Sequence, residues 1–259
     1  MSYKRVLTIQ DISCVGQCSL TVALPIISAC GVECCILPSA VLSTHTAGFT
    51  GFTCRDLSGD FPQIFEHWKK EGIGFDAIYT GYLGSERQID YILDFVGSLK
   101  DRPLLIVDPA MADNGKLYPA FGQDYVKAMK RLCEAADIVL PNITEYDFLM
   151  QEGMRLKKGA CLVLTGVSKR EGYTGVSVSS ENTDYYYEHE RCREDRHGTG
   201  DIYSSAFVGA LMQGKSTQQA ARIAADYTLL TIKDAQGNSE HFYGVEFEKF
   251  LPQLIGMLK

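Results

Sequence analysis

The 259-residue sequence lacks a long apolar run, a basic stripe and a signal-like start. Its longest apolar runs, such as Leu104 to Val107, fall far short of the roughly 20 residues that cross a bilayer. The formal net charge is −7 and lysine and arginine do not cluster, so the positive surface that nucleic acid binding requires is missing. The segment Met1 to Gln10 has no basic part followed by an apolar part. We therefore expect a cytoplasmic protein that binds neither membranes nor nucleic acid.

Paired zinc-binding knuckles are also absent, although nine cysteines is a high and odd count for this length. Neither Cys14 with Cys18 nor the adjacent Cys34 and Cys35 gives the paired short spacings of a structural zinc site. A disulfide framework is not expected, because nothing indicates secretion. Most of the cysteines have apolar neighbours, so we interpret them as inert, reduced thiols.

What the sequence does contain is an alternation of short β-branched runs with longer amphipathic segments. Glu86 to Leu99 is typical of the second kind, because its apolar residues recur at helical spacing and would pack on a sheet. Strands are predicted at 5–10, 32–37, 77–80, 104–107, 138–140 and 161–164. Helices are predicted at 19–30, 61–72, 86–99, through 129–133, at 144–150 with Thr144 as the cap, and at 201–213, 216–234 and 245–258.

This alternation predicts an α/β fold of three layers, with helices on both faces of a mostly parallel sheet. Two later runs, 175–179 and 183–189, flank a polar turn and predict an antiparallel pair at one edge of that sheet. No linker or repeat divides the chain, so residues 1–259 are expected to form one domain. In such folds ligands bind where the strands end, which makes strand-terminal polar residues the candidates for a site.

One segment, Gly209 to Ser216, satisfies the P-loop pattern letter for letter. A P-loop must follow a strand, whereas the residues before Gly209 predict one long helix. Gly214 is better explained as the glycine that ends this helix, and Ser216 or Thr217 as the cap of the next one. We therefore do not expect this segment to bind phosphate.

A stronger candidate lies just upstream, where His197-Gly198-Thr199-Gly200-Asp201 leads into the predicted helix. The two glycines allow the backbone to turn tightly and to approach a ligand. The helix start offers unpaired N–H groups and a partial positive charge, which can hold a transferring phosphoryl group. Asp201 could then accept a proton from an attacking hydroxyl. The alternative is that the glycines only form a turn and that Asp201 only complements the helix dipole.

Further polar residues follow the predicted strands at what should be the same edge of the sheet. They are Asp108, Asp113, Asn142, Glu145, Thr165 and Gly166. Carboxylate and amide oxygens suit Mg²⁺, which keeps some of its waters and bridges phosphates. Each residue alone has a simpler explanation, because Glu145 could complete a capping box and Asp108 could start a turn.

Together these motifs resemble the ribokinase superfamily, and within it the pyridoxal kinase (pyridoxine/pyridoxamine kinase) family, from Leu7 to about Thr231. The motifs are Gly198-Thr199-Gly200-Asp201, Asp108-Pro109, Pro141-Asn142-x-x-Glu145 and Gly81-Tyr82-Leu83-Gly84-Ser85. The last of them, with His45-Thr46, is the part specific to vitamin B6 kinases, and the others are shared by the superfamily. The resemblance implies a ribokinase-like fold, a homodimer, and phosphorylation of the 5′-hydroxymethyl group of a B6 vitamer by ATP and Mg²⁺.

For catalysis, the resemblance implies that Asp201 is the general base. Gly198, Thr199 and Gly200 would form the anion hole for the transferring phosphate. The small-molecule partners would be ATP and the vitamer.

For the nucleotide, the resemblance implies that Asp108 and Glu145 organise Mg–ATP through water molecules. Asn142, Thr165 and Gly166 would line the nucleotide side. The resemblance also implies that a monovalent cation such as K⁺ would bind near Asp113.

For the alcohol substrate, the resemblance implies that Asp11, His45, Thr46 and Tyr82 surround the pyridine ring. Tyr82 would offer an aromatic or polar wall. For His45 a purely structural role is an equally good interpretation.

The sequence departs from the family pattern at Asp11, where many pyridoxal kinases have a serine. A carboxylate there could accept a hydrogen bond from a protonated pyridine nitrogen or pair with the ammonium group of pyridoxamine. We therefore expect a preference for pyridoxamine over pyridoxal, relative to serine-bearing relatives. A second departure, Ala110-Met111-Ala112 where relatives often have a glycine after the methionine, concerns only the shape of that loop.

Three other functions are compatible with parts of this pattern. A hydroxymethylpyrimidine kinase of thiamine synthesis would share the fold and the role of Asp201, but the segment from Gly81 to Ser85 favours a B6 vitamer. A sugar kinase is disfavoured because no additional strand lid is evident. A non-catalytic vitamin-binding protein would have no need of a base beside an anion hole.

Overall fold

The computed structural model describes residues 3–46, 48–192, 196–236 and 241–259. The strands in these ranges are β1 (Arg5–Ser13), β2 (Glu33–Leu42), β3 (Cys54–Asp56), β4 (Ala77–Thr80), β5 (Leu104–Val107), β6 (Ala112–Asp113), β7 (Lys116–Leu117), β8 (Ile138–Val139), β9 (Cys161–Val167), β10 (Tyr173–Ser180) and β11 (Thr183–Glu190). Nine of those described strands form one sheet in the order β11-β10-β9-β8-β5-β4-β1-β2-β3, and β6 pairs with β7. Strands β2, β1, β4, β5, β8 and β9 are parallel, whereas β3 and the pair β10–β11 are antiparallel at the two edges.

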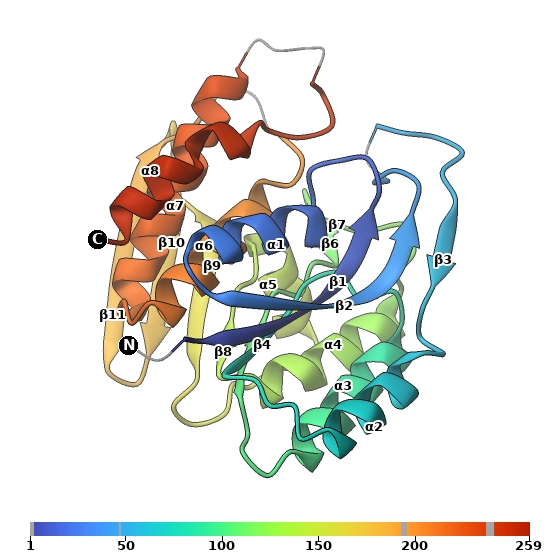
Figure 1. Ribbon diagram of the computed structural model, residues 1–259. Helices are drawn as coiled ribbons and strands as arrows, with labels where there is room; N and C mark the ends of the chain where they lie inside the picture. Colours follow the sequence, from blue (N-terminus) through green and yellow to red (C-terminus); the bar gives the residue numbers. More distant parts are fainter. Residues whose placement is uncertain (1–2, 47, 193–195, 237–240) are drawn as a thin grey trace.

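Helices cover both faces of this sheet (Figure 1). One face carries α1 (Leu20–Ala29), α6 (Thr199–Met212), α7 (Thr217–Ala235), the 3₁₀-helix η1 (Phe247–Phe250) and α8 (Leu251–Met257). The other carries α2 (Phe61–Lys70), α3 (Glu86–Ser98), α4 (Gln123–Ala135) and α5 (Ile143–Gln151). Each face has its own apolar core, in which a fully buried side chain such as Phe207 or Phe61 contributes about 1.5–3 kcal/mol. The predicted three-layer α/β fold with a mostly parallel sheet and an antiparallel edge is confirmed.

Two local predictions about the elements were wrong, and three short strands were missed. The segment 245–258 is not one helix, because Pro252 lacks an N–H and can stand only in the first turn, so α8 starts at Leu251 after the separate η1. The cap of α5 is Asn142 and not Thr144, whose hydroxyl instead accepts a hydrogen bond from the N–H of Gly115. Strands β3, β6 and β7 were not predicted, since they are only two or three residues long.

The P-loop match at Gly209 to Ser216 has the structural explanation that the sequence predicted. Gly209 lies inside α6, where an added Cβ would come within 2.4 Å of the Sγ atom of Cys30, the C-cap of α1. Gly214 follows the end of α6 with a φ of 83°, and Ser216 caps α7 in a capping box with Gln219. The segment is therefore a helix end and a helix start.

Two observations concern the described residues as a whole. Within those ranges, the helices lack the combination of length and hydropathy that crossing a bilayer requires. All nine cysteines are described and free, and burial raises the pKa of several thiols, including those of Cys30 and Cys34 to about 12.

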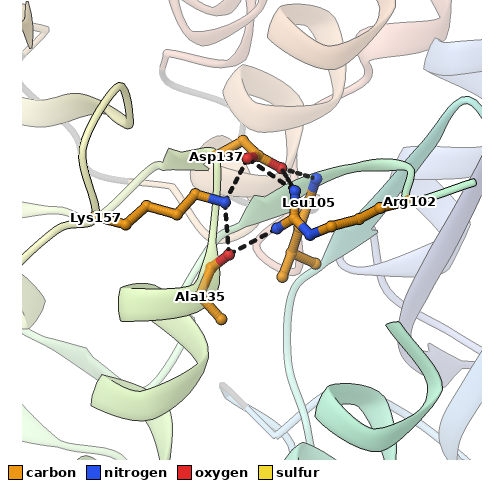
Figure 2. Close-up of polar contacts among 5 residues, drawn as sticks. All are labelled: Arg102, Leu105, Ala135, Asp137 and Lys157. Carbon is orange, nitrogen blue, oxygen red and sulfur yellow. Dashed lines mark hydrogen bonds and ion pairs between the residues drawn. The ribbon is translucent and has the colours of Figure 1, made fainter. Parts of the chain in front are cut away.

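Asp137 lies just before β8, where the parallel strands begin, and it links several neighbouring segments (Figure 2). Its carboxylate accepts hydrogen bonds from the Arg102 guanidinium at 2.9 and 3.0 Å, from the Leu105 N–H at 2.7 Å, and from the Lys157 ammonium. Both cations also donate to the Ala135 carbonyl, at 2.8 and 2.9 Å. Burial alone would raise the pKa of Asp137, but these donors outweigh it and hold the pKa below its usual value.

We expect Asp137→Asn to lower the free energy of unfolding by about 1–3 kcal/mol at neutral pH, because it removes the charge that both cations share. A carboxyl whose pKa is lower in the folded than in the unfolded state stabilises the fold above the unfolded value of about 3.9. That contribution is lost as the pH falls through the folded pKa. Urea unfolding at pH 7 and pH 3 should thus show a difference between wild type and variant that shrinks in acid.

The matched control for this prediction is Asp90→Asn, which breaks the 2.7 Å ion pair with Arg131 between two half-exposed side chains. Exposed pairs of this kind contribute about 0–1 kcal/mol. Equal losses from the two variants would mean that the Asp137 cluster has no special structural role.

Candidate active site

The sequence-predicted site residues lie where the parallel strands end. The carboxyl ends of parallel strands share one edge of the sheet, and residues from β1, β4, β5, β8 and β9 meet there. Asp201 on α6 lies close enough to Asp108 and Asp11 for both charges to affect its pKa. Asp108 in turn affects Glu145. An isolated bridge pairs Asn142, just after β8, with Thr165 in β9.

The turn that leads into α6 brings its backbone N–H groups to this edge. Gly198 is the N-cap of α6 and has a left-handed φ of 78°, which glycine adopts without strain. An added Cβ would lie 1.9 Å from the Gln17 carbonyl oxygen, so only glycine fits. The Gly198 carbonyl accepts the first helical bond from Ile202, while the first N–H groups of α6 have no partner within the helix. Such a helix start can bind an anion.

Asp201 stands in the first turn of α6 and is partly exposed. Burial is the main cause that raises its pKa to about 7, and the charges of Asp108 and Asp11 act in the same direction. A hydrogen bond with the Ser19 backbone opposes them. A carboxyl group with a pKa near neutrality is suited to take up a proton at physiological pH.

Asp108 and Glu145 form a second, more deeply buried acidic pair, with exposed fractions of 8% and 2%. Asp108 Oδ2 accepts a 2.7 Å hydrogen bond from the Ser204 hydroxyl, and Oδ1 accepts from the Ala110 N–H at 3.2 Å. The Glu145 oxygens accept from the N–H groups of Met111 at 3.0 Å and Asn142 at 2.9 Å.

Burial is the main cause that raises the pKa of both carboxyls in this pair, and for Glu145 the charge of Asp108 adds to it. Glu145 also completes a capping box with Asn142, so the helix-capping role that the sequence offered as the alternative is observed. A third donor, the Ala112 N–H, also lowers the pKa of Glu145, and a carboxylate with about four lone-pair sites still has capacity left after three donors.

The acidic pair fits a cation that is not part of the protein. In the described ranges, no lysine or arginine is paired with Asp108 or Glu145, although buried carboxylates are normally compensated. The same ranges contain no group of three or more His, Cys, Asp and Glu side chains that could hold a metal ion by themselves. Two carboxylates with free lone pairs match Mg²⁺, which is commonly held by one or two carboxylates together with waters and substrate phosphates.

Asp113 lies on β6 and is exposed. Its carboxylate accepts hydrogen bonds from the neighbouring Asn114, from the N–H at 2.8 Å and from the side-chain amide at 3.1 Å. Thr165 donates from its N–H to the Pro141 carbonyl at 3.0 Å, and Gly166 follows with a φ of 76°. The residues predicted for the nucleotide side thus come from adjoining strand ends.

Among the residues predicted to hold the alcohol substrate, Asp11 lies close enough to Asp201 for its charge to raise the pKa of that carboxyl. Asp11 is 5% exposed, sits at a bulge in β1 between Gln10 and Ile12, and accepts a 3.0 Å hydrogen bond from the Ser13 hydroxyl. Burial raises the pKa of Asp11. Burial, followed by the charge of Asp11, raises the pKa of Tyr82 to about 12, so its hydroxyl remains protonated.

His45 and Thr46, in the loop after β2, differ in their surroundings. Thr46 is exposed, whereas His45 is buried and its Nε2 lies 2.9 Å from the Tyr243 carbonyl oxygen. The His45 ring centroid is 5.8 Å from that of His197, next to the turn at Gly198. His45 therefore connects the substrate-side loop to the start of α6.

Three residues of this region were missed by sequence reasoning. Ser204 lies three positions after Asp201, on the same helical face, and this spacing could have identified it. Cys54 on β3 contributes to the raised pKa of Tyr82, but β3 itself was not predicted. Burial raises the pKa of Tyr118, and the charges of four carboxylates add to this effect: Glu145, Asp201, Asp108 and Asp113. No sequence motif distinguishes this tyrosine.

Comparison with known proteins gives one family. The phosphomethylpyrimidine kinase family model matches residues 24–245. A crystal structure from Bacteroides thetaiotaomicron, of a suggested phosphomethylpyrimidine kinase, is 34% identical with a TM-score of 0.90, over 98% of this chain and 94% of that one. An orthorhombic form of the protein under this description was solved with pyridoxal. Pyridoxal kinase from Lactobacillus plantarum is 31% identical with a TM-score of 0.90, over 99% and 98% of the two chains.

A curated relative is a thiamine biosynthetic bifunctional enzyme of Arabidopsis thaliana, 28% identical over 93% of this chain. The alignment covers 51% of the plant protein, so the chain spans about half the length of that relative.

Proposed function

Because the chain belongs to the phosphomethylpyrimidine kinase family, within the ribokinase superfamily, we propose that it phosphorylates the 5′-hydroxymethyl group of a vitamin B6 vitamer. It is a kinase, an ATP-using phosphotransferase that acts on an alcohol group of a B6-type or pyrimidine substrate. The finer assignment, to a B6 vitamer in pyridoxal phosphate salvage, is our proposal. We also propose that residues 1–259 act as one kinase domain.

The observation that carries the proposal is the position of the Asp201 carboxylate. It stands in the first turn of α6, directly after the glycine turn that exposes backbone N–H groups. Its pKa of about 7 is suited to a general base, and Asp11 lies near enough to raise that pKa. In this assignment Asp201 accepts the proton of the alcohol, and the N–H groups of 198–200 stabilise the transferring phosphoryl group.

For the nucleotide side, Asp108 and Glu145 would hold Mg²⁺ with ATP, with Asn142, Thr165 and Gly166 beside the nucleotide. Bound there, Mg²⁺ would neutralise charge on the phosphates during transfer. The uncompensated burial of the two carboxylates supports this assignment. Asp113 stays a predicted ligand of a monovalent cation such as K⁺.

For the alcohol, Asp11, His45, Thr46 and Tyr82 would surround the pyridine ring. The pyridoxal in the crystal of the 34%-identical relative supports a B6 vitamer. The family model and the thiamine biosynthetic relative support hydroxymethylpyrimidine as the second candidate. Purified protein with ATP and Mg²⁺ should therefore be assayed against pyridoxal, pyridoxamine, pyridoxine and hydroxymethylpyrimidine. A higher kcat/KM for hydroxymethylpyrimidine than for every vitamer would overturn the B6 assignment.

We expect Asp11→Ser to lower the kcat/KM ratio of pyridoxamine to pyridoxal by about tenfold or more, because a charged hydrogen bond contributes about 1.5–3 kcal/mol. The buried carboxylate can pair with the ammonium group of pyridoxamine, whereas pyridoxal has no cation at that position. Pyridoxine, assayed in parallel, controls for a general loss of activity. An unchanged ratio would mean that Asp11 does not interact with the ammonium group of pyridoxamine.

We also propose that the protein is a homodimer, as the family resemblance implies, and that it acts in the cytoplasm. Sedimentation of the purified protein and fractionation of cells are the direct measurements.

A further inference from the structure

The turn that begins α6 is packed directly against the backbone of another loop. With a Cβ on Gly198 placed only 1.9 Å from the Gln17 carbonyl oxygen, the two backbones are in contact. The conformation of Gly198 sets the direction of the N–H groups that follow it. The position of the Gln17 carbonyl therefore limits where this turn can lie.

Gln17 is held from the far end of the chain. Its side-chain Nε2 donates to both carboxylate oxygens of Glu248, each at 2.9 Å, and its Oε1 lies 2.7 Å from Nε2 of His241. The Gln17 N–H donates to the Tyr243 carbonyl at 3.4 Å. Gly244 packs closely enough that an added Cβ would come within 2.6 Å of the Gln17 Cβ. Both ends of the amide are thus engaged by the segment 241–248.

We propose that Gln17, anchored by the segment 241–248, is a positioning residue that fixes the anion-binding turn at Gly198. This inference rests on the proposed function, because it assigns the turn to the transferring phosphoryl group. The side chain of Gln17 contacts the segment 241–248, and only its backbone carbonyl contacts the turn at Gly198. Donors that are fixed before the reaction stabilise the transition state without reorganisation, and a displacement of about 1 Å can cost about 100-fold in rate.

The first test is Gln17→Ala, which keeps the carbonyl but removes its side-chain anchors. We expect kcat to fall by about 10- to 100-fold while the KM for the alcohol is unchanged. Gly244→Ala displaces Gln17 by steric contact and leaves its amide intact, so it should give the same pattern. Lys249→Ala is the control, because Lys249 also lies on η1 but pairs with Glu246 and Asp234 instead of Gln17. Its kcat should equal that of the wild type.

A second readout needs no alcohol substrate. ADP with Mg²⁺ and aluminium fluoride mimics the transferring phosphoryl group, and calorimetry should show that Gln17→Ala weakens its binding while ADP alone binds as before. Wild-type kcat and fluoride-complex binding in both Gln17→Ala and Gly244→Ala would overturn the inference. The inference would also be overturned if kcat fell in step with the melting temperature and the KM for the alcohol rose by the same factor. A wild type that phosphorylates none of the alcohols refutes the proposed function, and the fluoride complex still decides the role of Gln17.

Discussion

Asp201→Asn is expected to lower kcat by about 10²- to 10⁴-fold while both substrates still bind. Asparagine keeps the shape of the side chain but cannot accept a proton from the attacking hydroxyl. The backbone turn at Gly198 is not altered, so the residual rate should reflect positioning and the anion hole alone. Steady-state kinetics with both substrates varied, and calorimetry of alcohol binding, measure the two halves of this expectation.

The pH dependence of the same pair of proteins gives a stricter test of Asp201. A base works only when it is deprotonated, and burial raises the pKa of Asp201 to about 7. Wild-type kcat/KM should therefore fall as the pH drops below about 7, and the residual activity of the variant should lack this limb. Asp124→Asn is the matched control, because Asp124 also stands in the first turn of a helix, α4, but is exposed at the surface. If Asp201 only complemented the helix dipole, the two variants would behave alike.

Gly198→Ala is expected to reduce phosphoryl transfer by about 100-fold or more, since it displaces the turn that carries the anion-binding N–H groups. Alanine at a φ of 78° costs about 1–2 kcal/mol, and its Cβ would also overlap the Gln17 carbonyl at 1.9 Å. The turn cannot keep its position with both penalties. Transfer rates and the melting temperature should be measured together.

The control for this variant is Gly172→Ala, which has a φ of 76° but no heavy atom within 4 Å of the added Cβ. It separates the cost of the left-handed backbone from the overlap with Gln17. A variant at Gly198 that melts like the Gly172 variant and still transfers phosphate at the wild-type rate would show that the turn is not the anion site.

The layers of the fold could be predicted because the period of the apolar residues and the positions of the apolar runs along the chain are strong signals. Strands such as Ala77–Thr80 and Leu104–Val107 are buried apolar runs, and both ranges agree with the structure. In contrast, all three residues of Cys54–Asp56 are exposed and show no apolar pattern, so nothing in them distinguishes this strand from a loop. Asn142 and Thr144 are both good helix caps, and only the extended backbone of Asn142 decides between them.

The candidate site could be predicted as far as strand order determines it. Parallel strands bring Asp11, Asp108 and Asn142 to one edge whatever the loops do. Spatial relations that depend on loop conformation could not be predicted, such as the proximity of Tyr118 to Glu145 and Asp201 or the contact of Gln17 with Gly198. These pairs are far apart in sequence and follow no repeat, so they require the folded chain.

The buried carboxyls of Asp108 and Glu145, together with the raised pKa of Asp201, set conformational stability against activity at this one edge of the molecule. Neutral replacements such as asparagine or glutamine would relieve the repulsion among these carboxylates. Directed evolution for thermal stability alone would therefore select neutral substitutions at these positions, and the selected proteins would be inactive. A selection that also requires turnover would find stabilising substitutions only elsewhere in the fold.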